Sequence, residues 1–191
     1  MRFEDGSSMR LYRQTVEDFG LYAGRELTEE EMTDLRKSAG EMSAKMRAVR
    51  IVAASSVSKR DLEHRLIHKG EDPMQAKQAV EWMSDLHLVD DARTAAQIVD
   101  RCIHKGYGLS RAKQALYEKR IPKEYWEDAL AEYPDQTDKI VEFLRSRLKA
   151  GFQERDVRRV TDALLRRGHS YQQIRRAMQQ LELDADFQED F

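Results

Sequence analysis

The chain has 191 residues, a formal net charge of −2 and a mean hydropathy of −0.77. No apolar run approaches the roughly 20 residues of a membrane-spanning helix, and none follows the first charges at the N-terminus, so we expect neither a membrane segment nor a secretory signal. The single cysteine, Cys102, excludes an internal disulfide and a cysteine zinc cluster, and one thiol fits the reducing cytoplasm, where we expect the protein to work.

The composition favours helices throughout. Nine Gly and three Pro leave little material for turns, while the abundant Ala, Leu, Arg, Lys, Glu and Gln are strong helix formers. Near the N-terminus, residues 9–13 are compatible with a short extended piece. Thr28 and Glu31 form a capping box for a helix that we expect to end near Gly40. We interpret residues 1–41 as an N-terminal appendage.

Residues 42–88 carry the pattern of three helices, which we call repeat 1. Apolar residues at helical spacing mark the first helix over residues 42–53. Ser58, followed three residues later by an aspartate, is a typical N-cap for the second helix, and Gly70 ends that helix. An Asp-Pro pair at 72–73 opens the third helix, because Asp caps a helix and Pro suits its first position.

The same order recurs twice. In residues 89–134, repeat 2, Asp90 or Asp91 caps the first helix, residues 106–108 break the chain, and Pro122 opens the third helix.

In residues 135–182, repeat 3, the first helix is expected to end at Gly151 and the second at Gly168. Ser170, with a glutamine three residues on, caps the third helix. Residues 183–191 are interpreted as an acidic tail.

The three copies align on Leu66, Leu116 and Leu164, which lie 50 and 48 residues apart. The residue type also agrees at four other positions counted from the anchor leucine. Four residues before it are Leu62, Ala112 and Val160, and three after it are Lys69, Lys119 and Arg167. Thirteen after it are Ala79, Ala129 and Ala177, and fourteen after it are Val80, Leu130 and Met178. One unit of about 50 residues has too little core to be stable alone, so neighbours must stack. We therefore predict an all-α fold, in which three tandem three-helix repeats form an elongated curved array with a short N-terminal appendage. The three-helix armadillo repeat, of similar length, is a structural alternative.

No catalytic constellation is recognisable. Residues 106–108 begin like a dinucleotide-binding loop but lack its third glycine and its β-strand. His64 and His68 share a helix face at metal-ligand spacing, but Arg65 stands where the metalloprotease pattern needs Glu, and no third ligand is in view. Cys102 lies on an apolar stripe and is interpreted as core. We expect no cofactor, no metal and no enzymatic activity.

The charge is unevenly distributed. Residues 139–181 carry +7, whereas residues 1–42 carry −4 and residues 182–191 carry −5. This asymmetry suggests an anionic partner or docking of the acidic tail, and solvated helix faces are the alternative. Basic residues recur on the second helix of each repeat, at Lys59, Arg60, Arg65, Lys69, Arg111, Lys113, Lys119, Arg155, Arg158, Arg159, Arg166 and Arg167. Repeat 3 adds Arg145 and Arg147 on its first helix and Arg175 and Arg176 on its third. We predict that they form a basic edge that contacts a partner, and contacts any nucleic acid through its backbone, because no feature for reading bases is evident.

Four stretches carry a family resemblance: Leu88-Val89-Asp90-Asp91 with Ala95; Gly106-Tyr107-Gly108 with Leu116, Lys119 and Ile121; Ser58 with Asp61-Leu62, Leu66, Lys69 and Gly70; and the lead-in Gly24-Arg25-Glu26-Leu27-Thr28. In order and spacing they resemble the RecX family of bacterial proteins that modulate the RecA recombinase. The sequence departs from the family pattern at Arg120, which replaces a glycine, at Asp61, which replaces a glutamate, and at Ser56-Val57, where an arginine is common.

The resemblance implies a stoichiometric inhibitor that binds in the helical groove of the RecA–DNA filament. Such a protein would inhibit RecA ATP hydrolysis, strand exchange and filament growth, in DNA repair, recombination and the SOS response, and we expect it to be a monomer. The alternative function is an armadillo-like adaptor that binds an acidic protein or peptide.

Overall fold

The computed structural model describes residues 1–4, 6–148 and 153–189, with side chains as far as Leu181. Within these ranges the regular structure is helical, apart from one isolated bridge between Arg2 and Ser8. The predicted all-α class is therefore confirmed. None of the described helices is long and apolar enough to cross a membrane. The chain divides into two compact units, residues 1–90 and residues 91–191.

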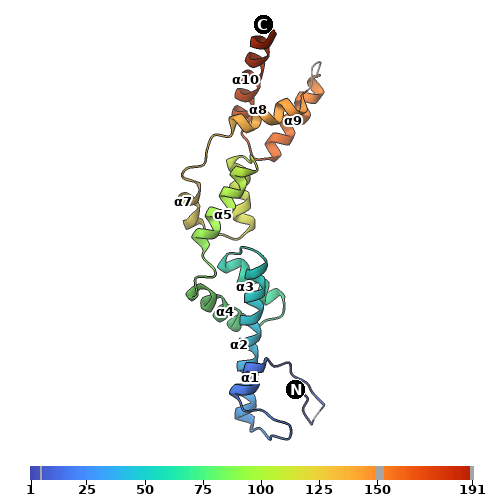
Figure 1. Cartoon of the computed structure of the whole chain (residues 1–191), viewed down its shortest axis with the longest axis vertical. Coiled ribbons are helices and arrows are strands. Elements are labelled where there is room, and N and C mark those ends of the chain that lie inside the picture. The colour runs from blue at the N-terminus through green and yellow to red at the C-terminus, as the bar shows by residue number, and fades with distance from the viewer. Residues whose placement is uncertain (5, 149–152, 190–191) are drawn as a thin grey trace. The chain divides into compact units, whose positions relative to one another are not determined.

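The first unit is built on one long helix, α2 (Glu29–Ala54). The unit also contains α1 (Arg13–Asp18), α3 (Lys59–His68) and α4 (Pro73–Asp85). Helix α4 packs along α2, α3 contacts both, and α1 contacts α2 (Figure 1). Leu62, Leu66 and Met83 are almost fully buried in the shared apolar cluster. Burial of each such side chain stabilises the fold by roughly 1.5–3 kcal/mol.

Helix α2 contradicts the expectation that a helix ends near Gly40. It runs from Glu29 to Ala54, so the predicted appendage shares a helix with repeat 1. A Cβ at residue 40 would overlap the side-chain amide of Gln75 on α4. The Gln75 amide occupies the space beside Gly40, and this glycine does not stop α2.

Most predicted helix starts are confirmed by their caps. Thr28 and Glu31 form the reciprocal capping box of α2, in which the Glu31 N–H donates to the Thr28 hydroxyl at 3.1 Å and the Thr28 N–H donates to the Glu31 carboxylate at 2.9 Å. Side-chain oxygens also accept backbone N–H bonds at the starts of α3, α4 and the last helix, at Ser58, Asp72 and Ser170. These groups satisfy backbone donors that a helix start leaves unpaired.

The second unit contains two groups of helices. The first group is α5 (Asp91–His104), α6 (Leu109–Glu118), the 3-10 helix η1 (Lys123–Tyr125) and α7 (Trp126–Leu130). The second group is α8 (Thr137–Arg147), α9 (Glu154–Arg166) and α10 (Tyr171–Glu189). Helix α5 contacts α6 and α7, and α8 packs mainly on α10 (Figure 1). Pro122 precedes η1 and α7, where the sequence suggested one helix.

The same turn ends the second helix of each predicted repeat. The N–H five residues after each anchor leucine donates to that leucine's carbonyl, at 3.1, 3.0 and 3.2 Å for Leu66, Leu116 and Leu164. The residue before that donor has a positive φ, of 90° at Gly70, 54° at Arg120 and 87° at Gly168. This is the hydrogen bond of a Schellman motif, whose left-handed position favours glycine.

Three separate apolar clusters accompany these turns. They span residues 44–89, 95–133 and 140–181, close to the ranges of the three predicted repeats. The exact repeat bounds and the curved array remain predictions. Helix α8 ends at Arg147 and Leu148 is extended, so this helix ends before the predicted position at Gly151, which itself lies outside the described residues. The side chains of the acidic tail are also outside them, although the backbone of α10 is helical as far as Glu189.

Candidate partner-binding surface

The densest set of exposed cations lies along α9. At about 100° per residue, four arginines share one face of this helix. They are Arg155, Arg158, Arg159 and Arg166, and all four are exposed. The opposite face carries Val160 and Leu164, which are buried in the cluster with α8 and α10. The apolar side therefore orients α9 and turns its guanidinium groups toward solvent.

Few acidic groups neutralise this arginine face. The Glu154 carboxylate lies 3.6 Å from the Arg158 guanidinium, but both side chains are largely exposed, at 93% and 77%. Such solvent-exposed pairs contribute little free energy and are easily exchanged for other partners. Asp162 lies on the same face and is exposed. The face keeps an excess of positive charge.

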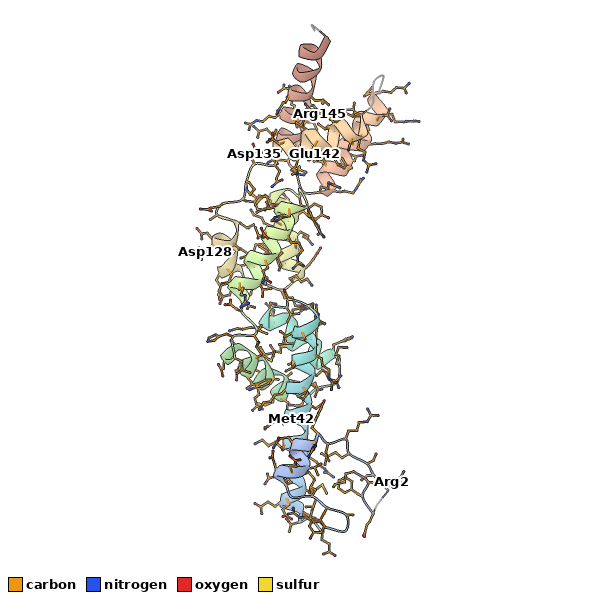
Figure 2. The ribbon with its side chains drawn as sticks, in the orientation of Figure 1. Arg2, Met42, Asp128, Asp135, Glu142 and Arg145 are labelled. Atoms are coloured by element: carbon orange, nitrogen blue, oxygen red, sulfur yellow. The ribbon has the colours of Figure 1, made fainter. Side chains whose placement is uncertain are left out.

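Helices α8 and α10 contribute further predicted residues. Arg175 and Arg176 are exposed on α10, beside the buried Ile174 and Ala177. On α8, Arg145 and Arg147 are also exposed. Figure 2 draws the side chains on the ribbon, with Glu142 and Arg145 labelled on α8.

Two arginines are held against an aromatic ring. The Arg167 guanidinium lies 4.4 Å and the Arg147 guanidinium 5.5 Å from the centre of the Phe143 ring. Cation–π contacts of this kind hold a guanidinium in place without neutralising its charge. Arg167 is therefore a fixed cation, unlike the freely exposed arginines of α9.

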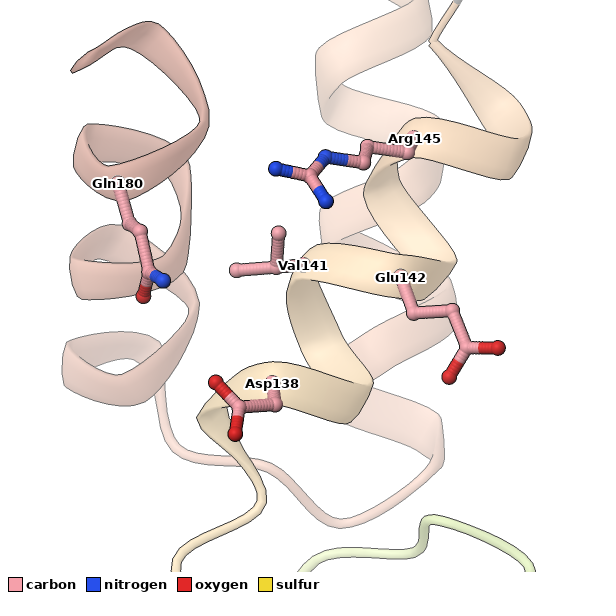
Figure 3. A pocket seen from close by; sticks show the side chains of 5 residues that line it. All are labelled: Asp138, Val141, Glu142, Arg145 and Gln180. Atoms are coloured by element: carbon pink, nitrogen blue, oxygen red, sulfur yellow. The ribbon is translucent and has the colours of Figure 1, made fainter. Parts of the chain in front are cut away.

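A hollow of about 350 Å³ lies between α8 and α10. Figure 3 shows Arg145 and Val141 directed from α8 toward Gln180 of α10, whereas the Glu142 carboxylate points to the other side. Asp138 lies at the beginning of α8. The mixed charges of this hollow favour no single class of ligand.

The predicted cations of α6 differ in their surroundings. The Arg111 guanidinium donates to the Glu118 carboxylate at 2.9 Å, and this hydrogen bond lowers the pKa of Glu118 and raises that of Arg111. Lys113 is exposed and Lys119 is partly exposed. The ion pair fixes Arg111 along its own helix, so Lys113 is the more accessible cation of α6.

In repeat 1 the predicted set is less uniform. Arg65 forms an ion pair at 2.8 Å with Asp61, whose side chain is only 10% exposed. Arg60 and Lys69 are exposed, and Lys59 is partly exposed. Arg65 is thus engaged with the N-terminal turn of α3.

An exposed apolar residue follows each buried anchor leucine. Ile67, Tyr117 and Leu165 are 40%, 69% and 43% exposed and occupy equivalent positions in the three second helices. None of the three was predicted as a contact residue, although an apolar residue one position after each anchor is visible in the sequence. Single exposed apolar side chains are common on protein surfaces, so it is their recurrence at one position of each repeat that makes these three candidates for a partner contact.

Backbone contacts join repeats 2 and 3 within the second unit. The Gly108 N–H donates to the Arg167 carbonyl at 2.9 Å, and the Ser110 N–H donates to the Gly168 carbonyl at 3.3 Å. A Cβ at residue 108 would overlap the backbone of Gly168 and His169. The glycine at 108 therefore serves this close approach, consistent with the interpretation of residues 106–108 as a helix break.

His169 completes this junction. Its Nε2 lies 3.0 Å from the Gly106 carbonyl and must carry the hydrogen, because a carbonyl only accepts. The side chain is buried, and desolvation lowers the pKa of His169, as does the charge of Arg167, while the bond to Gly106 opposes them. The ring is therefore neutral at physiological pH.

The residues considered for metal or redox chemistry have structural surroundings. In the part of the chain that is described, no group of three or more His, Cys, Asp or Glu is placed to hold a metal ion. The His64 and His68 rings stack 6.3 Å apart. Cys102 is buried, as predicted, and burial raises the pKa of its thiol.

The chain is similar to proteins of one family. Residues 90–130 match the model of the RecX second three-helix domain. The regulatory protein RecX of Vibrio cholerae is 30% identical over 140 residues, which cover 72% of this chain and 92% of that protein. The regulatory protein RecX of Clostridioides difficile is 22% identical over 184 residues, 93% of this chain and 86% of the relative.

Solved structures share the fold. A crystal structure of regulatory protein RecX superposes with a TM-score of 0.68 at 19% identity, covering 93% of this chain and 92% of that one. The crystal structure of RecX from Lactobacillus salivarius gives a TM-score of 0.66 at 22% identity, over 76% of this chain and 99% of that one.

Proposed function

The chain belongs to the RecX family of regulatory proteins, and from that premise we propose that it binds in the groove of a RecA–DNA filament and inhibits RecA. It reduces RecA ATP hydrolysis, strand exchange and filament growth, as a cytoplasmic monomer and without chemistry of its own. The filament offers two anionic surfaces, the DNA phosphates and acidic side chains of RecA.

The arginine face of α9 is the observation that carries this proposal. Four guanidinium groups on one helix face suit phosphates and carboxylates, because each presents several donors in a fixed plane. The apolar side of α9 is buried, so these groups are presented without any rearrangement of the core. Arg175 and Arg176 on α10 extend the positive charge.

The direct test adds the protein to RecA filaments on single-stranded DNA. We expect ATP hydrolysis and strand exchange to fall as the protein approaches stoichiometry with RecA. Unchanged rates at an excess of protein would contradict inhibition of RecA.

A triple variant tests the role of α9. The variant combines Arg155→Ala, Arg159→Ala and Arg166→Ala, which remove three exposed charges without touching the core. We expect inhibition of RecA to need at least about tenfold more protein, because charge-assisted hydrogen bonds contribute roughly 1.5–3 kcal/mol each. The matched control removes three exposed charges from the first unit, at Arg36, Lys37 and Lys77. Equal inhibition by the two triple variants would place the contact elsewhere.

The exposed Tyr117 beside Lys113 on α6 supports the alternative, an adaptor for an acidic protein or peptide. The same RecA assay separates the two functions. An adaptor with no role in DNA metabolism would leave ATP hydrolysis and strand exchange unchanged.

A further inference from the structure

A small pocket opens at the junction of repeats 2 and 3 in the second unit. Its volume is about 280 Å³, and it lies between the end of α5, one face of α8 and the turn after α9. Three long cationic side chains line it, those of Lys105, Lys139 and Arg167. They come from three separate elements, so the fold gathers charges that are far apart in the sequence.

These cations have little internal compensation. The one carboxylate in the lining, that of Glu142, lies 3.2 Å from the Lys139 ammonium. Among the described residues, no carboxylate forms an ion pair with Lys105 or Arg167. With one carboxylate among three cations the lining keeps a net positive charge, and such a cluster attracts an anion from solution.

The arginine in the pocket is fixed in position. Its guanidinium lies 4.4 Å from the centre of the Phe143 ring, which supports one face and leaves the N–H edge for a ligand. Ser146 also lines the pocket, with its hydroxyl committed to the Phe143 carbonyl at 2.7 Å. The site thus combines one pre-positioned guanidinium with two flexible ammonium groups.

We propose that this pocket binds a phosphate group. Two lysines and an arginine surround a space of about 280 Å³, which is large enough for a phosphate group. Together they suit an anion with several oxygens better than they suit a single carboxylate. The group belongs either to a free polyphosphate or to a nucleic-acid backbone. Phosphate binding here does not depend on recognition of RecA.

Two probes distinguish these sources. Sodium tripolyphosphate is titrated into the full-length protein by calorimetry at low salt, and a fluorescein-labelled oligo(dT) is titrated by fluorescence anisotropy. We expect saturable binding of at least one probe. Tripolyphosphate binding identifies a free polyphosphate as a ligand, whereas binding of the oligonucleotide alone identifies the backbone.

Variants connect binding to the pocket. Lys105→Gln with Lys139→Gln should weaken binding about tenfold or more, because charge-assisted hydrogen bonds are lost. The control, Lys77→Gln with Lys123→Gln, removes the same charge from exposed sites outside the pocket and should change affinity less than about twofold.

A third variant keeps the test independent of any folding defect. Ser146→Glu places a negative charge at an exposed pocket position and should weaken binding to a similar degree, with thermal melting as the check on folding. Absence of binding to both probes, equal affinities of the two double variants, or an unchanged affinity of folded Ser146→Glu would each overturn the proposal. Neither probe contains RecA, so these outcomes are separate from failure of RecA inhibition.

Discussion

At the residue scale, one of the three turns that follow an anchor leucine has an arginine at the left-handed position that favours glycine. Gly70 and Gly168 have φ values of 90° and 87°, which glycine adopts freely. Arg120 holds φ at 54° in the equivalent position of repeat 2. The left-handed conformation costs a residue with a Cβ roughly 1–2 kcal/mol, so this turn is locally strained.

Arg120→Gly should therefore stabilise the protein. We expect the free energy of unfolding to rise by about 0.5–1 kcal/mol, because relief of the strain is partly offset by the greater freedom of glycine in the unfolded chain. Urea denaturation measures the change. Arg120→Ala removes the same side chain but keeps the Cβ, and should give no such gain; equal effects of the two substitutions would place the cause in the arginine side chain.

Local side-chain chemistry made several residues predictable. The caps at Thr28 and Ser58 bond to backbone groups three residues away, so a short window of sequence contains the whole interaction. The burial of Cys102 followed from helical periodicity. Gly40 was misinterpreted because a glycine alone does not end a helix, and α2 continues to Ala54 along its contact with α4.

At the element scale, the arginine face of α9 was predictable, but the phosphate pocket was not. Residues 155, 159 and 166 share a face through helical geometry alone. Lys105, Lys139 and Arg167 belong to α5, α8 and the turn after α9, and only the packing of repeat 3 on repeat 2 brings them together. The predicted end of a helix at Gly40 failed for the same reason, since the packing of α2 on α4 decides it.

The junction of repeats 2 and 3, where His169 contacts Gly106, should make stability depend on pH. Burial lowers the pKa of His169, so the unfolded chain takes up its proton near pH 6.5 while the folded chain does so only at lower pH. Protonation therefore favours unfolding. The full contribution of the neutral ring is present above about pH 6.5 and is lost as pH falls toward the lowered pKa.

Urea denaturation between about pH 7.5 and pH 5 measures this effect. We expect the wild type to lose stability as the pH falls over this range. His169→Gln keeps a donor for the Gly106 carbonyl but does not titrate, so its stability should vary less over this range. Glu31 and Glu118, whose pKa values are lowered, lose their contributions only further into acid. An identical pH dependence in the two proteins would exclude His169 as the titrating group.

At the scale of the whole molecule, the net charge of −2 conceals the property that matters for binding. Residues 139–181 carry +7, and the acidic residues that cancel this value lie mostly at the two ends of the chain. The Debye length is about 8 Å at physiological ionic strength, so a partner responds mainly to the charges nearest to it and not to the net charge of the whole chain. The segment charge is therefore the relevant quantity for partner choice.

Binding to the RecA–DNA filament should consequently weaken steeply with salt. If the exposed arginines of α9 meet DNA phosphates, each contact releases condensed counterions, and the logarithm of affinity falls linearly with the logarithm of salt concentration. The triple variant at Arg155, Arg159 and Arg166 should lower the slope by up to about three, since each phosphate contact contributes roughly 0.7–0.9. Fluorescence anisotropy of labelled filaments over a series of salt concentrations measures both slopes. The control triple variant at Arg36, Lys37 and Lys77 should keep the wild-type slope; a wild-type slope in the α9 variant, with weaker binding, would assign these arginines to acidic side chains of RecA instead of to DNA.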